Sequence, residues 1–256
     1  TMIARMQTEN RPHGTICVAF TPDEEIGMGA EHFNLDQFGA EYAYTLDGDS
    51  EGEIQYENFN ACKAEFEIRG FNVHPGEGKD TMINASLVAI EINNCLPSME
   101  TPRGTEDYEG FYHLISMQGE VGEAKLNYIV RDHDKNGFEE RKKTLRLIEK
   151  NLNAKWGEGT VTLKITDQYL NMKEIVEEHM HLIDHAKKAC EAAGVAPLIL
   201  PIRGGTDGCQ LSFKGLPCPN LGTGGHAFHG PYEHISVEGM EKSVELLLAL
   251  IQEYTK

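Results

Sequence analysis

The chain has 256 residues, of which 40% are hydrophobic and 25% charged, so it can bury the core of one large domain or two smaller ones. Its formal net charge of −18 argues against nucleic acid and anionic membranes as partners, because both attract basic surfaces. The six cysteines form no Cys-x-x-Cys pair of the kind found in zinc sites. No apolar run reaches the length of a transmembrane helix, about 18 residues, and residues 1–10 lack the basic head and apolar block of a signal peptide. We therefore expect a cytoplasmic protein with reduced thiols.

The first predicted elements alternate between helix and strand. Residues 1–10 have apolar side chains at helical spacing, with no capping residue before them. A strand is predicted at 14–20, a short helix or turn at 31–38, and a second strand at 42–46, which ends at Asp47. This alternation is expected of an α/β protein with a mostly parallel sheet flanked by helices.

From about residue 58 the pattern changes to that of an inserted α+β unit. A strand, a helix, two strands, a helix and a strand are predicted at 64–68, 85–96, 111–117, 124–130, 137–152 and 161–165. This order is typical of a ferredoxin-like sandwich with an antiparallel sheet. We expect residues 58–167 to form an inserted domain, and residues 1–57 and 168–256 to form one discontinuous domain.

The α/β pattern resumes after the insertion. A helix is predicted at 173–193, a short strand at 198–202, and a final helix, capped by serine, at 236–254. Between them lies the glycine-rich run Arg-Gly-Gly-Thr-Asp-Gly at 203–208. Its backbone N–H groups and the Arg203 guanidinium can bind a phosphate or a carboxylate, but the run does not match a nucleotide-binding P-loop.

Several acidic and histidine side chains are candidates for chemistry. Glu24 and Glu25 follow the first predicted strand in Thr-Pro-Asp-Glu-Glu-Ile-Gly, at the sheet edge where α/β proteins bind ligands. One such carboxylate can hold a metal while the other moves protons. Asp47 at a second strand end and His229 in a glycine-bracketed loop complete a set of typical zinc ligands. Taken singly, each is better explained as a solvated turn acid, a turn former or a surface histidine, and only their combination favours a metal site.

Two further candidates lie in the inserted unit. His74 is in a His-Pro-Gly turn, and Arg131 is at a predicted strand end. A plain loop histidine and a salt-bridged surface arginine are the simpler interpretations of these two residues.

Six segments resemble the two-zinc exopeptidase family and follow one another in the order found in its tripeptide aminopeptidases. They are Thr-Pro-Asp-Glu-Glu-Ile-Gly (21–27), Asn-Val-His-Pro-Gly (72–76), Glu-Gly-Phe-Tyr-His-Leu (109–114), Tyr-Ile-Val-Arg-Asp (128–132), Pro-Ile-Arg-Gly-Gly-Thr-Asp-Gly (201–208) and Phe-His-Gly (228–230). The first segment alone identifies only the broad family, which also holds aminoacylase-like and carboxypeptidase-like enzymes. The segments at 72–76, 109–114 and 201–208 point to the tripeptide aminopeptidases.

The resemblance implies a zinc-exopeptidase-like mixed sheet and the release of the N-terminal residue from tripeptides. It implies that Glu24 is the general base and acid. It also implies that Glu25 and His229 ligate one zinc ion and Asp47 the other, so that the complete protein has two zinc ions per active site.

For the substrate, the resemblance implies a lid formed by the inserted domain. His74 from this lid would stabilise the oxyanion, and Arg131 and Arg203 would hold the C-terminal carboxylate of a short peptide. The resemblance also allows a homodimer that forms through the lid, in which His74 would serve a neighbouring site.

One part of the family's pattern is absent from this sequence. Family members have an upstream His-x-Asp and a further aspartate that bridges the metals, yet no histidine here has Asp two places later. These ligands would precede residue 1. We therefore expect the chain to be part of a longer protein, to bind zinc weakly, to have little activity alone and to expose an apolar face that makes it poorly soluble.

Two alternatives remain open at this point. The first is a related zinc dipeptidase or an amidohydrolase of N-acylated amino acids. The second is a non-catalytic binding or dimerisation protein that has kept the fold without a complete metal site. The presence of both glutamates, Asp47 and His229 argues against the second alternative.

Overall fold

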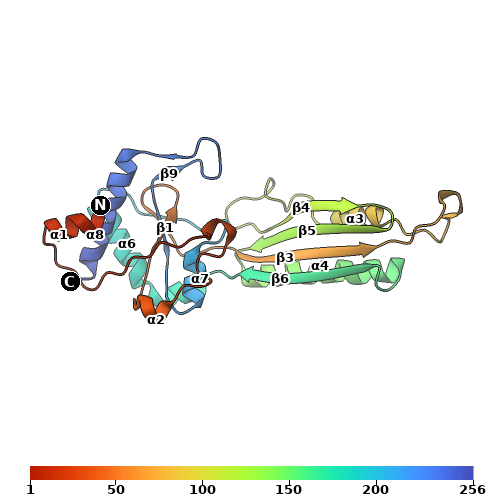
Figure 1. Cartoon of the computed structure of the whole chain (residues 1–256), viewed down its shortest axis with the longest axis horizontal. Coiled ribbons are helices and arrows are strands. Elements are labelled where there is room, and N and C mark those ends of the chain that lie inside the picture. Colours follow the sequence, from red (N-terminus) through yellow and green to blue (C-terminus); the bar gives the residue numbers. More distant parts are fainter. Residues whose placement is uncertain (256) are drawn as a thin grey trace. The chain divides into compact units, whose positions relative to one another are not determined.

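The computed structural model describes residues 1–255, which form two compact units (Figure 1). One unit combines Thr1–Asn58 with the chain from Asn171 onward, and the other is Phe59–Leu170. The structure therefore divides the chain after Asn58 and after Leu170, whereas the sequence predicts boundaries after residues 57 and 167. Each unit has its own sheet.

The second unit contains the antiparallel sheet. Its elements are β3 (Asn60–Arg69), η2 (Pro75–Glu77), α3 (Ala85–Asn94), β4 (Phe111–Gly119), β5 (Glu123–Asp132), α4 (Lys135–Trp156) and β6 (Val161–Tyr169). The strand order is β4-β5-β3-β6, and every neighbouring pair is antiparallel. This is the strand–helix–strand–strand–helix–strand arrangement that the sequence predicts.

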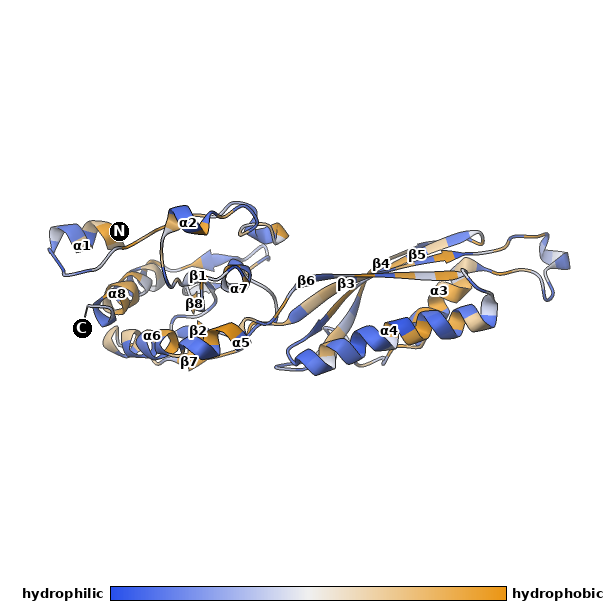
Figure 2. Cartoon of the chain, turned by 90° about the horizontal axis from the view of Figure 1, so that it is seen from below, coloured by the Kyte–Doolittle hydropathy of each residue, from blue (hydrophilic) through white to orange (hydrophobic). Residues whose placement is uncertain are grey.

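Alternation along the strands creates the core of this unit. In β3 and β5 every second side chain is buried, among them Phe66, Leu126 and Tyr128. Helices α3 and α4 lie on the same side of the sheet and cover this apolar face (Figure 2). Asp134 caps α4 by accepting a hydrogen bond from the Gly137 amide. Each large side chain buried in this way contributes about 1.5–3 kcal/mol to folding.

The first unit contains a mixed sheet. Its helical elements are α1 (Met2–Thr8), η1 (Glu24–Ile26), α2 (Leu35–Phe38), α5 (Lys173–Val176), η3 (Glu177–His179), α6 (His181–Ala192), α7 (Asp207–Phe213) and α8 (Val237–Glu253). Its strands are β1 (Thr45–Gly48), β2 (Glu53–Gln55), β7 (Leu198–Ile199), β8 (Asn220–Gly222), β9 (Gly225–His226) and β10 (His234–Ile235). The four-stranded order is β1-β8-β2-β7, with two parallel pairs and one antiparallel pair. A mixed sheet flanked by helices confirms the predicted fold class.

The strand predicted at 14–20 does not form. Residues 11–20 belong to no helix, strand or turn, and Phe20 is 95% exposed. The segment has the apolar composition of a strand, but no strand among the described residues pairs with it. A strand without a partner leaves its backbone groups to water and is not stable as such.

Other boundaries differ from the predicted ones in the same unit. The helix predicted at 173–193 is divided into α5, η3 and α6, and the strand predicted at 198–202 shrinks to the two residues of β7. Strand β1 begins later than predicted and includes Asp47 instead of ending before it. The final helix begins as predicted, because the Ser236 side chain accepts a hydrogen bond from the Gly239 amide. None of the helices within residues 1–255 has the length and apolarity needed to cross a membrane.

Candidate active site

Glu24 and Glu25 lie in the tight turn η1 and not at the end of a strand. The residues on either side of this turn, Asp23 and Gly27, have left-handed φ angles of 62° and 74°. Aspartate and glycine are residues that tolerate this region of backbone space. The Gly27 amide donates to the Glu24 carbonyl at 2.7 Å, and the Met28 amide donates to the Asp23 carbonyl at 3.0 Å. The turn therefore presents both carboxylates from one short, closed loop.

Asp47 interrupts the regular pairing of strand β1 with strand β8. In the parallel pairing of β1 with β8, Leu46 lies opposite Leu221 and Gly48 opposite Gly222, so Asp47 has no partner position. An extra residue of this kind is a β-bulge, which redirects a side chain and is frequent beside active sites.

His229 comes from the loop between β9 and β10. Its φ angle of 58° is left-handed, which is uncommon for a residue other than glycine. Its backbone amide donates to the Glu233 carboxylate at 2.9 Å. The imidazole Nε2 atom lies 3.5 Å from the Glu25 Oε2 atom, although both side chains are exposed. The loop thus brings His229 to the η1 carboxylates from the far end of the sequence.

These side chains share one electrostatic neighbourhood. The pKa of Glu24 is raised to about 7, chiefly by burial. Three carboxylates raise it further and one imidazole lowers it, namely those of Asp47, Asp207, Glu25 and His229. Burial also raises the pKa of Asp47, and the charges of Glu25 and Asp207 add to this effect. A concentration of negative charge with an adjacent imidazole is the setting in which a cation binds.

Asp207 is the member of this group that the sequence does not indicate as a site residue. It is the first residue of α7 and is only 4% exposed. Its Oδ2 atom accepts a hydrogen bond of 2.6 Å from the Thr21 hydroxyl, and its Oδ1 atom has no hydrogen-bond partner among the described residues. The glycine-rich run predicts an anion site through Arg203, and nothing in its pattern marks the acid four positions later as a site residue.

His74 and Arg131 both belong to the second unit but lie at opposite ends of its sheet. Arg131 pairs with Ala61 and Phe111, at the start of β3 and of β4. His74 follows the other end of β3, in a loop that extends beyond Arg69 (Figure 1). Eight residues of strand separate Ala61 from Arg69, which is about 26 Å at 3.3 Å per residue. Within one chain, the structure therefore keeps these two predicted site residues apart.

The donor set fits a divalent cation in chemistry but does not form a complete site. Within residues 1–255 no group of three or more His, Cys, Asp or Glu side chains is close enough to hold a metal ion. Within this donor set, Glu25 and His229 lie 3.5 Å apart. Carboxylate and imidazole are nevertheless the ligands that zinc and similar ions take in proteins.

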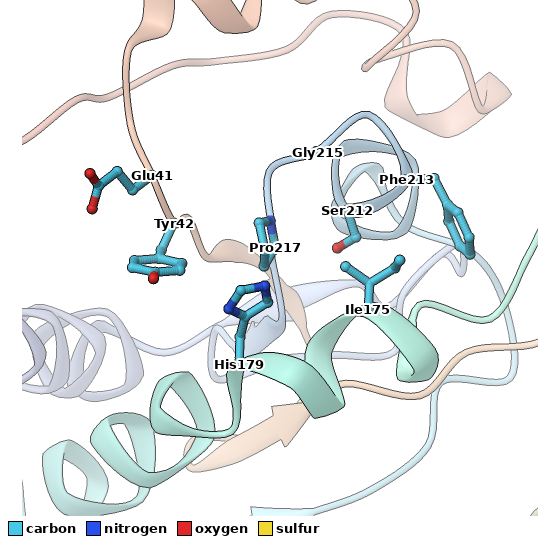
Figure 3. A pocket seen from close by; sticks show the side chains of 8 residues that line it. All are labelled: Glu41, Tyr42, Ile175, His179, Ser212, Phe213, Gly215 and Pro217. Carbon is cyan, nitrogen blue, oxygen red and sulfur yellow. The ribbon is translucent and has the colours of Figure 1, made fainter.

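The same unit contains a pocket of about 560 Å³ (Figure 3). It is lined by Glu41, Tyr42, Ile175, His179, Ser212, Phe213, Gly215 and Pro217. None of the predicted site residues is among them. The candidate active site is therefore the cluster of carboxylates around Glu24 and not this pocket.

Comparison of the sequence with known families and proteins gives a consistent result. The model of peptidase family M20/M25/M40 matches residues 1–253. Peptidase T of Halothermothrix orenii is 53% identical over 249 residues, which are 97% of this chain and 61% of that protein. Peptidase T of Clostridium perfringens is 55% identical over 244 residues, which are 95% and 60% of the two proteins. The chain spans about 60% of the length of these curated relatives.

Solved structures agree in fold. Aminopeptidase PepT from Bacillus cereus has a TM-score of 0.86 at 25% identity and covers 100% of this chain and 68% of its own. A tripeptidase from Staphylococcus aureus has a TM-score of 0.86 at 19% identity, covering 98% and 67%. The Bacillus subtilis protein YXEP, described as a dinuclear metal binding peptidase from the M20 family, has a TM-score of 0.67 at 16% identity, covering 92% and 64%. The chain belongs to peptidase family M20/M25/M40.

Proposed function

We propose that this chain carries the general base and part of the metal site of a zinc-dependent aminopeptidase that releases the N-terminal residue from tripeptides. The observation that carries this proposal is the convergence of Glu24, Glu25, Asp47 and His229, which come from three separate parts of the first unit. Their convergence in a chain that is 53–55% identical to proteins named Peptidase T supports this substrate class.

Glu25, Asp47 and His229 would hold two zinc ions in part. Zinc, when bound, supplies a Lewis acid that polarises the peptide carbonyl and lowers the pKa of water. The electrostatic repulsion among the carboxylates supports this role, because a divalent cation relieves it. The likeness in fold to the Bacillus subtilis protein YXEP, a dinuclear metal binding peptidase, supports a two-metal site.

Glu24 would move the proton. Its pKa is raised to about 7, so near neutral pH this carboxyl group can both take up and release a proton. Glu24 takes a proton from the attacking water and later gives it to the leaving amine. Burial is the main cause of the raised pKa, so the role depends on how the η1 turn is held against the rest of the unit.

Arg203, Arg131 and His74 would bind the substrate. The two guanidinium groups would hold the C-terminal carboxylate of a short peptide, and His74 would donate to the oxyanion. The separation of His74 from Arg131 within the second unit supports a homodimer through this lid, in which His74 serves the partner's site. All six cysteines are free thiols, which supports a cytoplasmic location.

The test is hydrolysis of an unblocked tripeptide by this chain with added zinc, compared with Glu24→Gln. We expect slow release of the N-terminal residue that depends on Glu24, and no release from the same tripeptide with an acetylated N-terminus. Equal rates for the chain and Glu24→Gln would overturn the assignment of the general base. Faster cleavage of dipeptides or N-acylated amino acids would indicate the related dipeptidase or amidohydrolase activity.

A further inference from the structure

One face of helix α7 contacts the loop that carries Glu24 and Glu25. Asp207, Gln210 and Lys214 are spaced i, i+3 and i+7, so they lie on one side of the helix and its C-terminal cap. Each of them bonds to the segment 21–31, which precedes the helix by more than 170 residues in the sequence. The three residues thus contact the segment near its start, after its turn and at its end.

The contacts are polar and are distributed from Thr21 to Glu31. The Asp207 carboxylate accepts from the Thr21 hydroxyl at 2.6 Å. The Gln210 side-chain amide donates to the Gly27 carbonyl at 2.9 Å. The Lys214 ammonium donates to the Glu31 carbonyl at 2.6 Å and also to the carbonyl of Ala30. Hydrogen bonds from a charged donor or to a charged acceptor are among the stronger ones in proteins.

Apart from the contact of Glu25 with His229, the segment has few other attachments among residues 1–255. Its turn η1 contains no buried residue, and the side chains of Ile26 and Met28 are exposed. Its apolar anchor is Ala30, which packs with Leu211 of α7. The part that carries the two glutamates therefore depends on the α7 contacts at both of its ends.

We propose that Asp207, Gln210 and Lys214 are positioning residues that clamp segment 21–31 and so determine where the Glu24 and Glu25 carboxylates lie. Asp207 and Lys214 act at the two ends of the segment, and Gln210 acts directly after the turn. The consequence for catalysis rests on the proposed function, whereas the clamp itself is a property of this chain.

Hydrogen exchange of the whole chain, followed by mass spectrometry of its peptides, tests the clamp directly. The amides of Ile26, Gly27 and Met28 are hydrogen-bonded inside the turn, so their exchange reports its opening. In Thr21→Val and Lys214→Met we expect them to exchange about five- to tenfold faster, the effect of losing one or two hydrogen bonds. Thr21→Ser keeps the hydroxyl and should restore slow exchange. Lys143→Met removes an exposed lysine of α4 and is the matched control.

Unchanged exchange of segment 21–31 in both Thr21→Val and Lys214→Met would overturn the clamp, and so would equally faster exchange of β3 and α4. The catalytic consequence has its own measurement. In tripeptide hydrolysis, Thr21→Val should lower kcat on the order of tenfold with little change in KM, because the general base is misplaced while the substrate site is intact. An inactive parent chain would leave only the proposed function to be tested in the longer protein, and exchange would still decide the clamp.

Discussion

Thr21 donates a hydrogen bond of 2.6 Å to the buried Asp207 carboxylate and so joins two positions that are 186 residues apart. The backbone of Gly29 lies so close to the same carboxylate that a side chain at position 29 would not fit. The η1 turn that carries the two glutamates lies between these attachments. The place of the candidate general base is therefore determined by a helix from the other end of the chain.

Gly29→Ala should destabilise the first unit. A Cβ atom at this position would lie 2.2 Å from Asp207 Oδ2 and 2.5 Å from Oδ1, so the buried carboxylate must move and give up the Thr21 hydroxyl. We expect a loss of about 1–3 kcal/mol in the free energy of unfolding, measured by urea denaturation. Gly14→Ala is the control, because a Cβ atom there meets nothing within 4 Å. Equal stability of the two variants would contradict this account.

The predictable part of the fold is the part with long, regular patterns. Helix α4 and strands β3 and β5 have clear apolar spacing, and the structure only extends their predicted ends. Strands β2 and β8 have three residues each, and such short segments show no period. They are strands because their neighbours bury them. The segment 14–20 is the opposite case, since it has the composition of a strand but no partner.

The candidate site was predictable to a similar degree. Predicted strand ends and a glycine-bracketed loop indicate Glu24, Glu25, Asp47 and His229 as candidates, and the resemblance implies their separate roles. No local pattern shows that their positions converge. Asp207 could not be selected, since its burial and its bond to Thr21 are long-range contacts. The separation of His74 from Arg131 likewise follows only from the register of β3 with β5.

Phe66→Ala should destabilise the second unit strongly. The Phe66 ring is fully buried between the sheet and its helices, at 6.2 Å from the ring of Tyr128. We expect a loss of about 3–5 kcal/mol, the cost of deleting a buried aromatic ring and leaving a cavity. Trp156 is the only tryptophan and lies at the end of α4, so its fluorescence reports the unfolding of this unit. Phe71→Ala removes a ring that is 55% exposed and should have a small effect. A similar loss in both variants would refute the assigned core.

His185 should make the first unit less stable at acidic pH. Burial lowers its pKa below the ordinary value of 6.5, and the charges of His181 and Lys188 lower the pKa further. The charges of Glu253 and Asp184 raise it, but their effect is smaller. A histidine with a lowered pKa in the folded state favours the neutral form, so its contribution is present above pH 6.5 and is lost as the pH falls through the folded value.

His185→Phe tests this pH dependence. Phenylalanine keeps a ring beside Tyr254, whose ring centroid lies 4.6 Å away, and cannot take up a proton. The thermal midpoint of the variant should fall less between pH 7.5 and pH 5 than that of the parent chain. His32→Phe serves as a control, because His32 is exposed in the same unit. An unchanged pH slope in His185→Phe would show that other groups cause the acid destabilisation.

Zinc should stabilise the first unit weakly and through His229. A ligand that binds only the folded state stabilises that state, and the gain grows with the logarithm of the ligand concentration relative to Kd. Since the described residues contain no ready group of three donors, we expect no change in thermal midpoint at equimolar zinc and a rise only at large excess, reversed by a chelator. His229→Ala should abolish the rise, because it removes the imidazole 3.5 Å from Glu25. His226→Ala removes a nearby exposed imidazole from β9 and should retain it. Two tightly bound zinc ions per chain, or an equal loss in both variants, would contradict the weak, His229-dependent site.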